Sequence, residues 1–147
     1  MATHCMQVDA SYWPLVVATF DGQQTDEDLE HYIAAMDAVH ARREPFVALT
    51  VARSYANNFA HVRRLGAWAK TTASVQKEFC KGAAIVVPSS SGRFLISSFL
   101  LIFVPPNPMV VLEDMRAAIP WVKQRLVEAN MVVPPSIAKL EVAANGG

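Results

Sequence analysis

Short apolar blocks divide this chain at nearly regular intervals. Four of them are rich in apolar residues throughout and lack the alternation of a half-exposed strand: residues 15–20, 46–51, 83–87 and 109–112. Blocks of this kind are typical of strands that are buried on both faces, as in parallel sheets. Residues 6–13 mix apolar and polar positions, which allows a further short strand at the edge of the sheet.

Apolar residues at helical spacing fill the intervals between these blocks. Thr25-Asp-Glu-Asp28 opens the first helix, because Thr25 can cap it and Asp28 stands at the capping-box position. The spacing predicts helices at 26–43, 59–79, 94–104 and from 113 onward. Strands that alternate with helices predict an α/β fold, in which about four helices cover a mainly parallel sheet of about four to five strands.

One domain accounts for nearly the whole chain. Its 147 residues match the usual size of a single domain, and no internal repeat or linker divides them. Pro134-Pro135 follow the last helical pattern, so we expect the domain to cover residues 1–135. Residues 136–147 become rich in alanine, asparagine and glycine, and we expect them to form a flexible C-terminal tail.

The charges cancel over the whole chain but not along it. Residues 1–44 hold eight acids and two bases, a net charge of −6, whereas residues 45–93 hold seven bases and one acid, a net charge of +6. The total of zero argues against nucleic acid as a partner, because domains that bind it are usually strongly basic. The two blocks contain the first two predicted helices, which could pair with each other or present opposite patches to other molecules.

The sequence shows no sign of secretion or of a membrane span. No basic region followed by an apolar one opens the chain, so we expect no signal peptide. Cys5 and Cys80 are too few for a disulfide framework, which predicts two reduced thiols in a cytoplasmic protein. The longest apolar stretch, 94–104, has 11 residues, against the roughly 20 that a transmembrane helix needs.

Three local features are similar to a known family. The strand at 15–20 passes through Asp21-Gly22 into a helix that opens with acids, and Arg93 leads an apolar helix that ends at proline. Residues 109–122 join a last strand to an alanine-rich helix that starts with acids and carries a tryptophan. Together with the order of elements, these features resemble the STAS fold (sulfate transporter and anti-sigma-factor antagonist), and within it the bacterial SpoIIAA-like group.

The resemblance implies a small, non-enzymatic domain that regulates or binds other proteins. In the anti-sigma antagonists, a phosphorylated serine follows an aspartate at the start of the helix after the central strand. The comparable stretch here is 52–57, where Ser54 follows Arg53 and the aspartate-serine-serine-glycine motif is missing. The SpoIIAA-like group is also compared with CRAL-TRIO lipid-binding domains, which leaves an apolar or amphiphilic small ligand as the alternative.

The segment Ser89-Ser90-Ser91-Gly92-Arg93 is a candidate anion site, because it follows a strand and opens a helix. Backbone N–H groups, serine hydroxyls and the arginine could hold a phosphate or carboxylate. The same residues also suit an ordinary polar loop with a serine N-cap, and no P-loop or GxGxxG pattern is present. Arg53, Ser54, Ser89, Ser90, Ser91 and Arg93 are the predicted anion- or partner-binding residues, on loops at the carboxyl ends of strands.

The helix predicted at 94–104 is apolar nearly all round, with polar residues only at Ser97 and Ser98. One interpretation is a helix fully buried against the sheet. The other is burial against a second subunit, a partner or an apolar ligand, because large apolar patches rarely stay exposed. The candidate contact residues are Phe94, Phe99, Leu100 and Phe103.

No arrangement of residues in the sequence indicates catalysis or a metal site. The four histidines lack the spacing of metal ligands, so we expect them on the surface or on helix flanks and expect no metal or cofactor. His61 and Cys80 lie 19 residues apart, about 28 Å along one helix, so they cannot form a nucleophile–base pair. The sequence therefore favours a non-enzymatic regulatory or protein-interaction module that forms a homodimer and binds another protein.

Overall fold

The computed structural model describes residues 5–53, 59–102 and 104–146, except for the side chains of residues 59, 99 and 102. The described strands and helices, in chain order, are β1 (Met6–Asp9), β2 (Leu15–Phe20), α1 (Asp26–Ala41), β3 (Phe46–Ala52), α2 (Phe59–Phe79), β4 (Cys80–Val86), α3 (Ser90–Ile102), β5 (Met109–Leu112), α4 (Met115–Glu128) and α5 (Ile137–Gly146).

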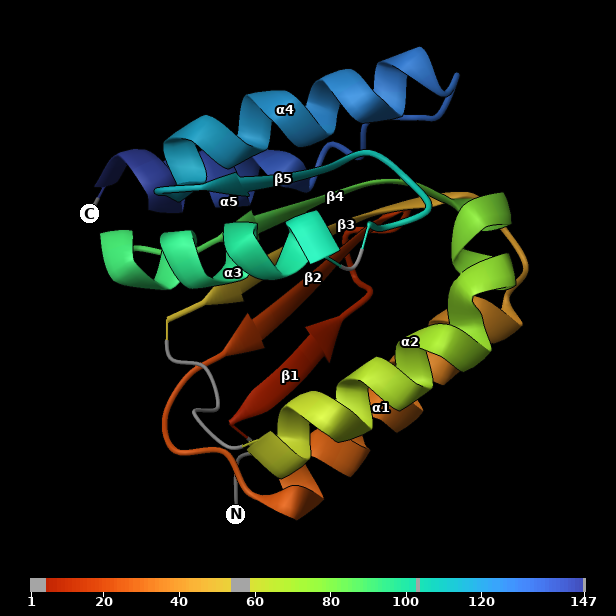
Figure 1. Cartoon of the computed structure of the whole chain (residues 1–147). Coiled ribbons are helices and arrows are strands. Elements are labelled where there is room, and N and C mark those ends of the chain that lie inside the picture. The colour runs from red at the N-terminus through yellow and green to blue at the C-terminus, as the bar shows by residue number, and fades with distance from the viewer. Residues whose placement is uncertain (1–4, 54–58, 103, 147) are drawn as a thin grey trace.

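The strands form one five-stranded sheet in the order β1-β2-β3-β4-β5 (Figure 1). β1 pairs antiparallel with β2, and the four strands β2 to β5 are parallel neighbours. Each parallel strand reaches the next through a helical crossover, which is the connection that parallel pairing requires. The prediction of an α/β domain with a mainly parallel sheet of four to five strands is confirmed.

Helices cover both faces of the sheet (Figure 1). Leu15 and Val17 pack in one buried cluster with residues of α4, such as Val122. Val16, between them on the same strand, packs in a second cluster with Met36 of α1. Neighbouring residues of β2 therefore enter opposite layers, because successive side chains of a strand point to opposite faces. This explains why the strands are nearly continuous apolar blocks.

The start of α1 has the predicted capping box. The Thr25 hydroxyl accepts a hydrogen bond from the Asp28 N–H at 3.1 Å, and the Asp28 carboxylate accepts one from the Thr25 N–H at 2.8 Å. The same carboxylate accepts the Cys5 N–H at 3.2 Å, although Asp28 itself is buried. One side chain thus holds both the helix start and the residue that precedes β1.

The C-terminal segment differs from the expected tail. Residues 137–146 form α5, and Ile137 is buried in the same cluster as Leu126 of α4. Leu140 and Ala144 also pack against this cluster. These three residues recur at helical spacing, which gives α5 an apolar side to bury. The pattern was missed in the sequence because the segment is rich in alanine, asparagine and glycine. With α5, the described residues contain five helices, whereas about four were predicted.

We predict that Asp28→Ala destabilises the fold by about 2–4 kcal/mol, because it leaves the N–H groups of Cys5 and Thr25 without their acceptor and removes half of the capping box. Urea unfolding measures the loss. Glu27→Ala is the matched control, since Glu27 lies in the same first turn but is exposed, and its effect should be much smaller. Equal losses in the two variants would contradict the assigned role of Asp28.

Candidate functional site

α3 leaves much of its apolar surface in contact with solvent. Its main contact is with the short edge strand β5. The side chains of Phe94, Leu95 and Leu101 are 71%, 56% and 83% exposed, and Val104, just after the helix, is 79% exposed. The interpretation of a helix fully buried against the sheet is therefore wrong for these residues. The surface formed by Phe94, Leu95, Leu101 and Val104 is called the α3 surface below.

The predicted apolar contact residues have different positions. Phe94 belongs to the α3 surface, whereas Leu100 is half-buried. The side chain of Phe99 and the whole of Phe103 lie outside the described residues. Leu95 and Leu101 were not predicted, because a helix that is apolar nearly all round gives no sequence signal for which side faces the sheet.

The serine-rich segment forms a helix start in which Ser89 and Arg93 are engaged within the chain. The Ser89 hydroxyl accepts a hydrogen bond from the Gly92 N–H at 3.1 Å, as an N-cap does. Arg93 Nη1 donates to the carbonyl oxygens of Val87 and Pro88 at 2.9 and 2.8 Å. Ser90 and Ser91 are exposed in the first turn of α3. Ser89 and Arg93 therefore have hydrogen-bond partners within the chain and need no bound anion to satisfy them.

Arg53 lies just after β3 and pairs with another loop. Its Nη1 is 3.5 Å from the Asp21 carboxylate, which follows β2, and both side chains are largely exposed. Ser54, the hydroxyl nearest to the position implied by the family resemblance, lies outside the described residues. Within the described part of the chain, no hydrogen bond or ion pair joins Arg53 to the segment around Arg93.

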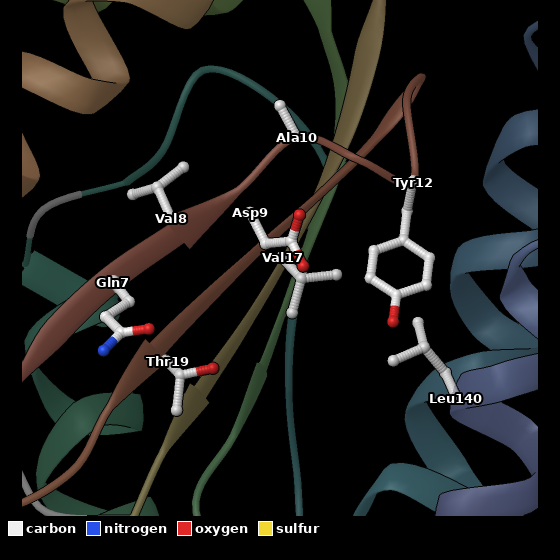
Figure 2. Close-up of a pocket in the computed structure, with 8 residues that line it drawn as sticks. All are labelled: Gln7, Val8, Asp9, Ala10, Tyr12, Val17, Thr19 and Leu140. Carbon is white, nitrogen blue, oxygen red and sulfur yellow. The ribbon is translucent and has the colours of Figure 1, made fainter.

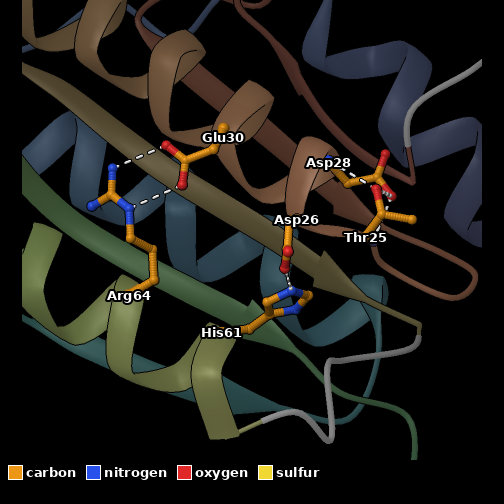
Figure 3. A network of polar contacts seen from close by, with 6 residues as sticks. All are labelled: Thr25, Asp26, Asp28, Glu30, His61 and Arg64. Carbon is orange, nitrogen blue, oxygen red and sulfur yellow. Dashed lines mark hydrogen bonds and ion pairs between the residues drawn. The ribbon is translucent and has the colours of Figure 1, made fainter.

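A row of polar contacts joins α1 to α2 (Figure 3). Arg64 donates two hydrogen bonds, at 2.9 and 3.0 Å, to the two carboxylate oxygens of Glu30. His61 Nε2 lies 2.7 Å from Asp26 Oδ1. The acidic and basic blocks of the sequence thus meet across two neighbouring helices. Of the two alternatives raised by the charge pattern, this is the pairing of the helices with each other. Part of each block neutralises the other inside the chain.

Two histidines lie deeper than the sequence predicted. His40 and His61 are buried, so their expected place on the surface or on helix flanks is wrong. His40 stacks on Trp68, with ring centroids 5.7 Å apart and planes 12° apart, and its Nε2 lies 2.8 Å from Gln76 Nε2. Burial lowers the pKa of His40, and Asp37 opposes part of that shift. Within the described residues, the Nδ1 atoms of both histidines are buried without a hydrogen-bond partner.

The buried thiol of Cys80 is unsuited to nucleophilic attack at neutral pH. It donates to the Gly82 carbonyl at 3.4 Å, and burial raises its pKa to about 11, so it stays protonated. Among the residues that the structure describes, no group of three or more histidines, cysteines and acids is placed to hold a metal ion. Over the same residues, every helix is too short or too polar to cross a membrane.

No residue of α3 lines either of two cavities that open on the surface of the described residues. The larger, of about 450 Å³, lies over β1 and β2 and is bordered by Tyr12 and by Leu140 of α5 (Figure 2). Gln7, Asp9 and Thr19 give it a polar floor. The second, of about 380 Å³, lies where α2, β4 and α4 meet and includes Lys77.

Comparison with known protein families, with curated proteins and with solved structures finds no match to this chain. The resemblance to STAS-like domains therefore stays a prediction, as does the cytoplasmic location. The α3 surface is the most distinctive feature of the described structure that an interaction could use. The candidate functional site is therefore the α3 surface, where several large apolar side chains of the described residues are exposed.

We predict that the free energy of unfolding decreases as the pH falls below about 6.5, the usual histidine value, through the lowered pKa of His40. In that range the unfolded chain binds more protons than the folded one, so acid favours unfolding. Urea unfolding at several pH values measures the slope, which should become smaller in His40→Gln. Equal slopes in His40→Gln and the wild type would exclude this role for His40.

Proposed function

We propose that this chain is a non-enzymatic protein-interaction domain that self-associates through the α3 surface. One observation carries the proposal. Eight large apolar side chains are exposed in the described part of the chain, and Phe94, Leu95, Leu101 and Val104 account for four of them. Soluble domains rarely expose apolar side chains in such a concentration unless another molecule covers them.

A second copy of the chain suits this surface by its charge. Residues 94–112 contain no acidic or basic side chain, so the α3 surface can meet its own copy without repulsion between like charges. Arg93, the nearest cation, already donates to two backbone carbonyls at the end of β4. Two-fold dimers, which pair one patch with itself, are the commonest soluble oligomers.

The alternative of an apolar small ligand has less support. Such ligands usually occupy enclosed, mostly apolar pockets. The cavity over β1 and β2 includes Asp9 and the cavity at the end of α2 includes Lys77, and neither includes a residue of α3. An exposed helix suits a protein partner better than a small molecule.

A regulatory role is the part of the proposal that rests on the resemblance to STAS-like domains. A domain without a catalytic centre can regulate only by binding, and the α3 surface is where we place that binding. In this view a further protein partner competes with the second copy for α3, or binds the dimer that α3 creates.

We predict a dimer in solution that Leu101→Asp or Leu95→Asp converts into a monomer. Each change puts an unpaired charge into the interface and should weaken association by about 2 kcal/mol or more, roughly 30-fold in Kd. Light scattering over a range of concentrations measures the mass, and circular dichroism checks the fold. Val142→Asp is the matched control, because Val142 on α5 is 72% exposed and outside the α3 surface.

A wild-type chain that is monomeric at all concentrations would contradict the self-association. Native mass spectrometry of protein purified from cells extends the test. A monomer that carries an apolar molecule, and loses it in Leu101→Asp, would favour the small-ligand alternative instead.

We also predict that the dimer depends little on salt. Because the α3 surface is uncharged and Glu30 pairs with Arg64 inside the chain, raising sodium chloride from about 0.05 to about 0.5 M should change Kd by less than about threefold. Analytical ultracentrifugation at both concentrations measures it. A marked weakening at high salt would place the association on the charged helices α1 and α2.

A further inference from the structure

The smaller cavity is separate from the α3 surface and does not depend on the proposed function. Four parts of the chain line it: the end of α2, the start of β4, the loop before β5 and the end of α4. Its volume of about 380 Å³ gives ample room for a small anion. The lining residues that matter to its chemistry are Lys77, Lys81, Asn107, Arg125 and Glu128.

Positive charge dominates the lining, with three cationic side chains and one acid. The acid, Glu128, is already engaged, since its carboxylate accepts hydrogen bonds from Arg125 at 2.6 Å and from Gln124 at 2.9 Å. Within the described residues, no ion pair is formed by Lys77 or Lys81. The Lys81 ammonium donates to the Glu78 carbonyl, which supplies no full negative charge. Two positive charges at the cavity therefore lack an acidic partner.

Asn107 reduces the negative potential at the end of α2. Its Nδ2 donates to the carbonyl oxygens of Gln76 and Cys80, both at 2.6 Å. Carbonyls at the C-terminus of a helix carry partial negative charge and would oppose an anion. Because the Asn107 amide binds these two oxygens, they present less negative charge to the cavity.

An irregularity in β4 lies beside the same cavity. Phe46 pairs with Cys80, but Ala48 pairs with Ala83, so β4 holds one more residue than β3 in this interval. Such bulges change the direction of side chains and are common near functional sites. Lys81 lies in this bulge, and its carbonyl accepts a hydrogen bond from Arg125 Nε at 3.2 Å.

Gly82, also in the bulge, leaves room for the arginine. A Cβ atom at this position would lie 3.0 Å from Cγ of Arg125 and 3.2 Å from the ring of Trp121. The missing side chain lets Arg125 lie close against β4. The Arg125 guanidinium is thus held at the cavity by two hydrogen bonds before any ligand arrives.

We infer that this cavity binds a phosphate-type oxyanion, either the free ion or a monoester of a small molecule. Lys77 and Lys81 supply the uncompensated charge, and Arg125 supplies a positioned donor. Hydrogen bonds between such cations and phosphate oxygens are stronger than those between neutral groups. A lysine in the last turn of a helix also stabilises the helix dipole, and this role alone would not require phosphate binding.

The test titrates inorganic phosphate into the full chain at constant ionic strength. Calorimetry gives the affinity, and the side-chain amide signal of Asn107 in NMR spectra reports on the cavity. We expect saturable binding at one site per chain. The double variant Lys77→Met/Lys81→Met, which keeps the aliphatic stems, should weaken binding by about tenfold or more. Lys70→Met removes an exposed cation from the same helix outside the cavity and should change Kd by less than about twofold.

Three outcomes would overturn the inference: shifts that never saturate, an equal loss in Lys70→Met, or a double variant that loses thermal stability while the wild type binds no phosphate. The last result would mean that the two lysines only stabilise the C-terminal end of α2. Phenyl phosphate separates the two sources of the oxyanion. Tighter binding than inorganic phosphate supports a monoester ligand, and weaker binding supports the free ion.

Discussion

Four parallel strands that must be buried on both faces determine how the rest of this domain is arranged. Parallel pairing forces the chain to leave the sheet after each strand and to return through a helix, and both sheet faces need apolar cover. α1 and α2 cover one face and α4 and α5 the other, so that Val16 and Val17 end in different clusters. Residues 137–146 form α5 and not a tail because Ile137 packs into the apolar cluster that includes Leu126 of α4.

The same requirement explains the two features that lie outside the core. α3 connects β4 to β5, a strand of only four residues at the edge of the sheet, and the apolar side chains of α3 that do not reach this strand remain exposed. The cationic cavity lies at the other end of β4, where a bulge and a glycine let Arg125 approach the sheet. Each feature arises where the regular packing of helix on sheet is interrupted, which is where a fold has surface available for binding.

Much of the fold followed from local signals. The capping box at Thr25 and Asp28 and the apolar block at 15–20 each depend on nearby residues, so they could be predicted from the sequence. The stacking of His40 on Trp68 and its contact with Gln76 could not, because both partners lie more than 25 residues away along the chain. The charge pattern predicted that the first two helices carry opposite net charge. It did not predict which side chains of the two helices would pair.

The amino-acid sequence was enough to predict the class of fold, the positions of the strands and most helices, and an apolar segment that carries no charge. These properties follow from periodicity and composition, which act over a few residues. The three-dimensional packing was needed to learn which side of α3 is exposed, that α1 and α2 pair through Glu30 and Arg64, and that Lys81 and Arg125 meet at one cavity. Contacts between distant segments depend on how the helices pack on the sheet. The spacing of apolar residues within one helix or strand does not determine that packing.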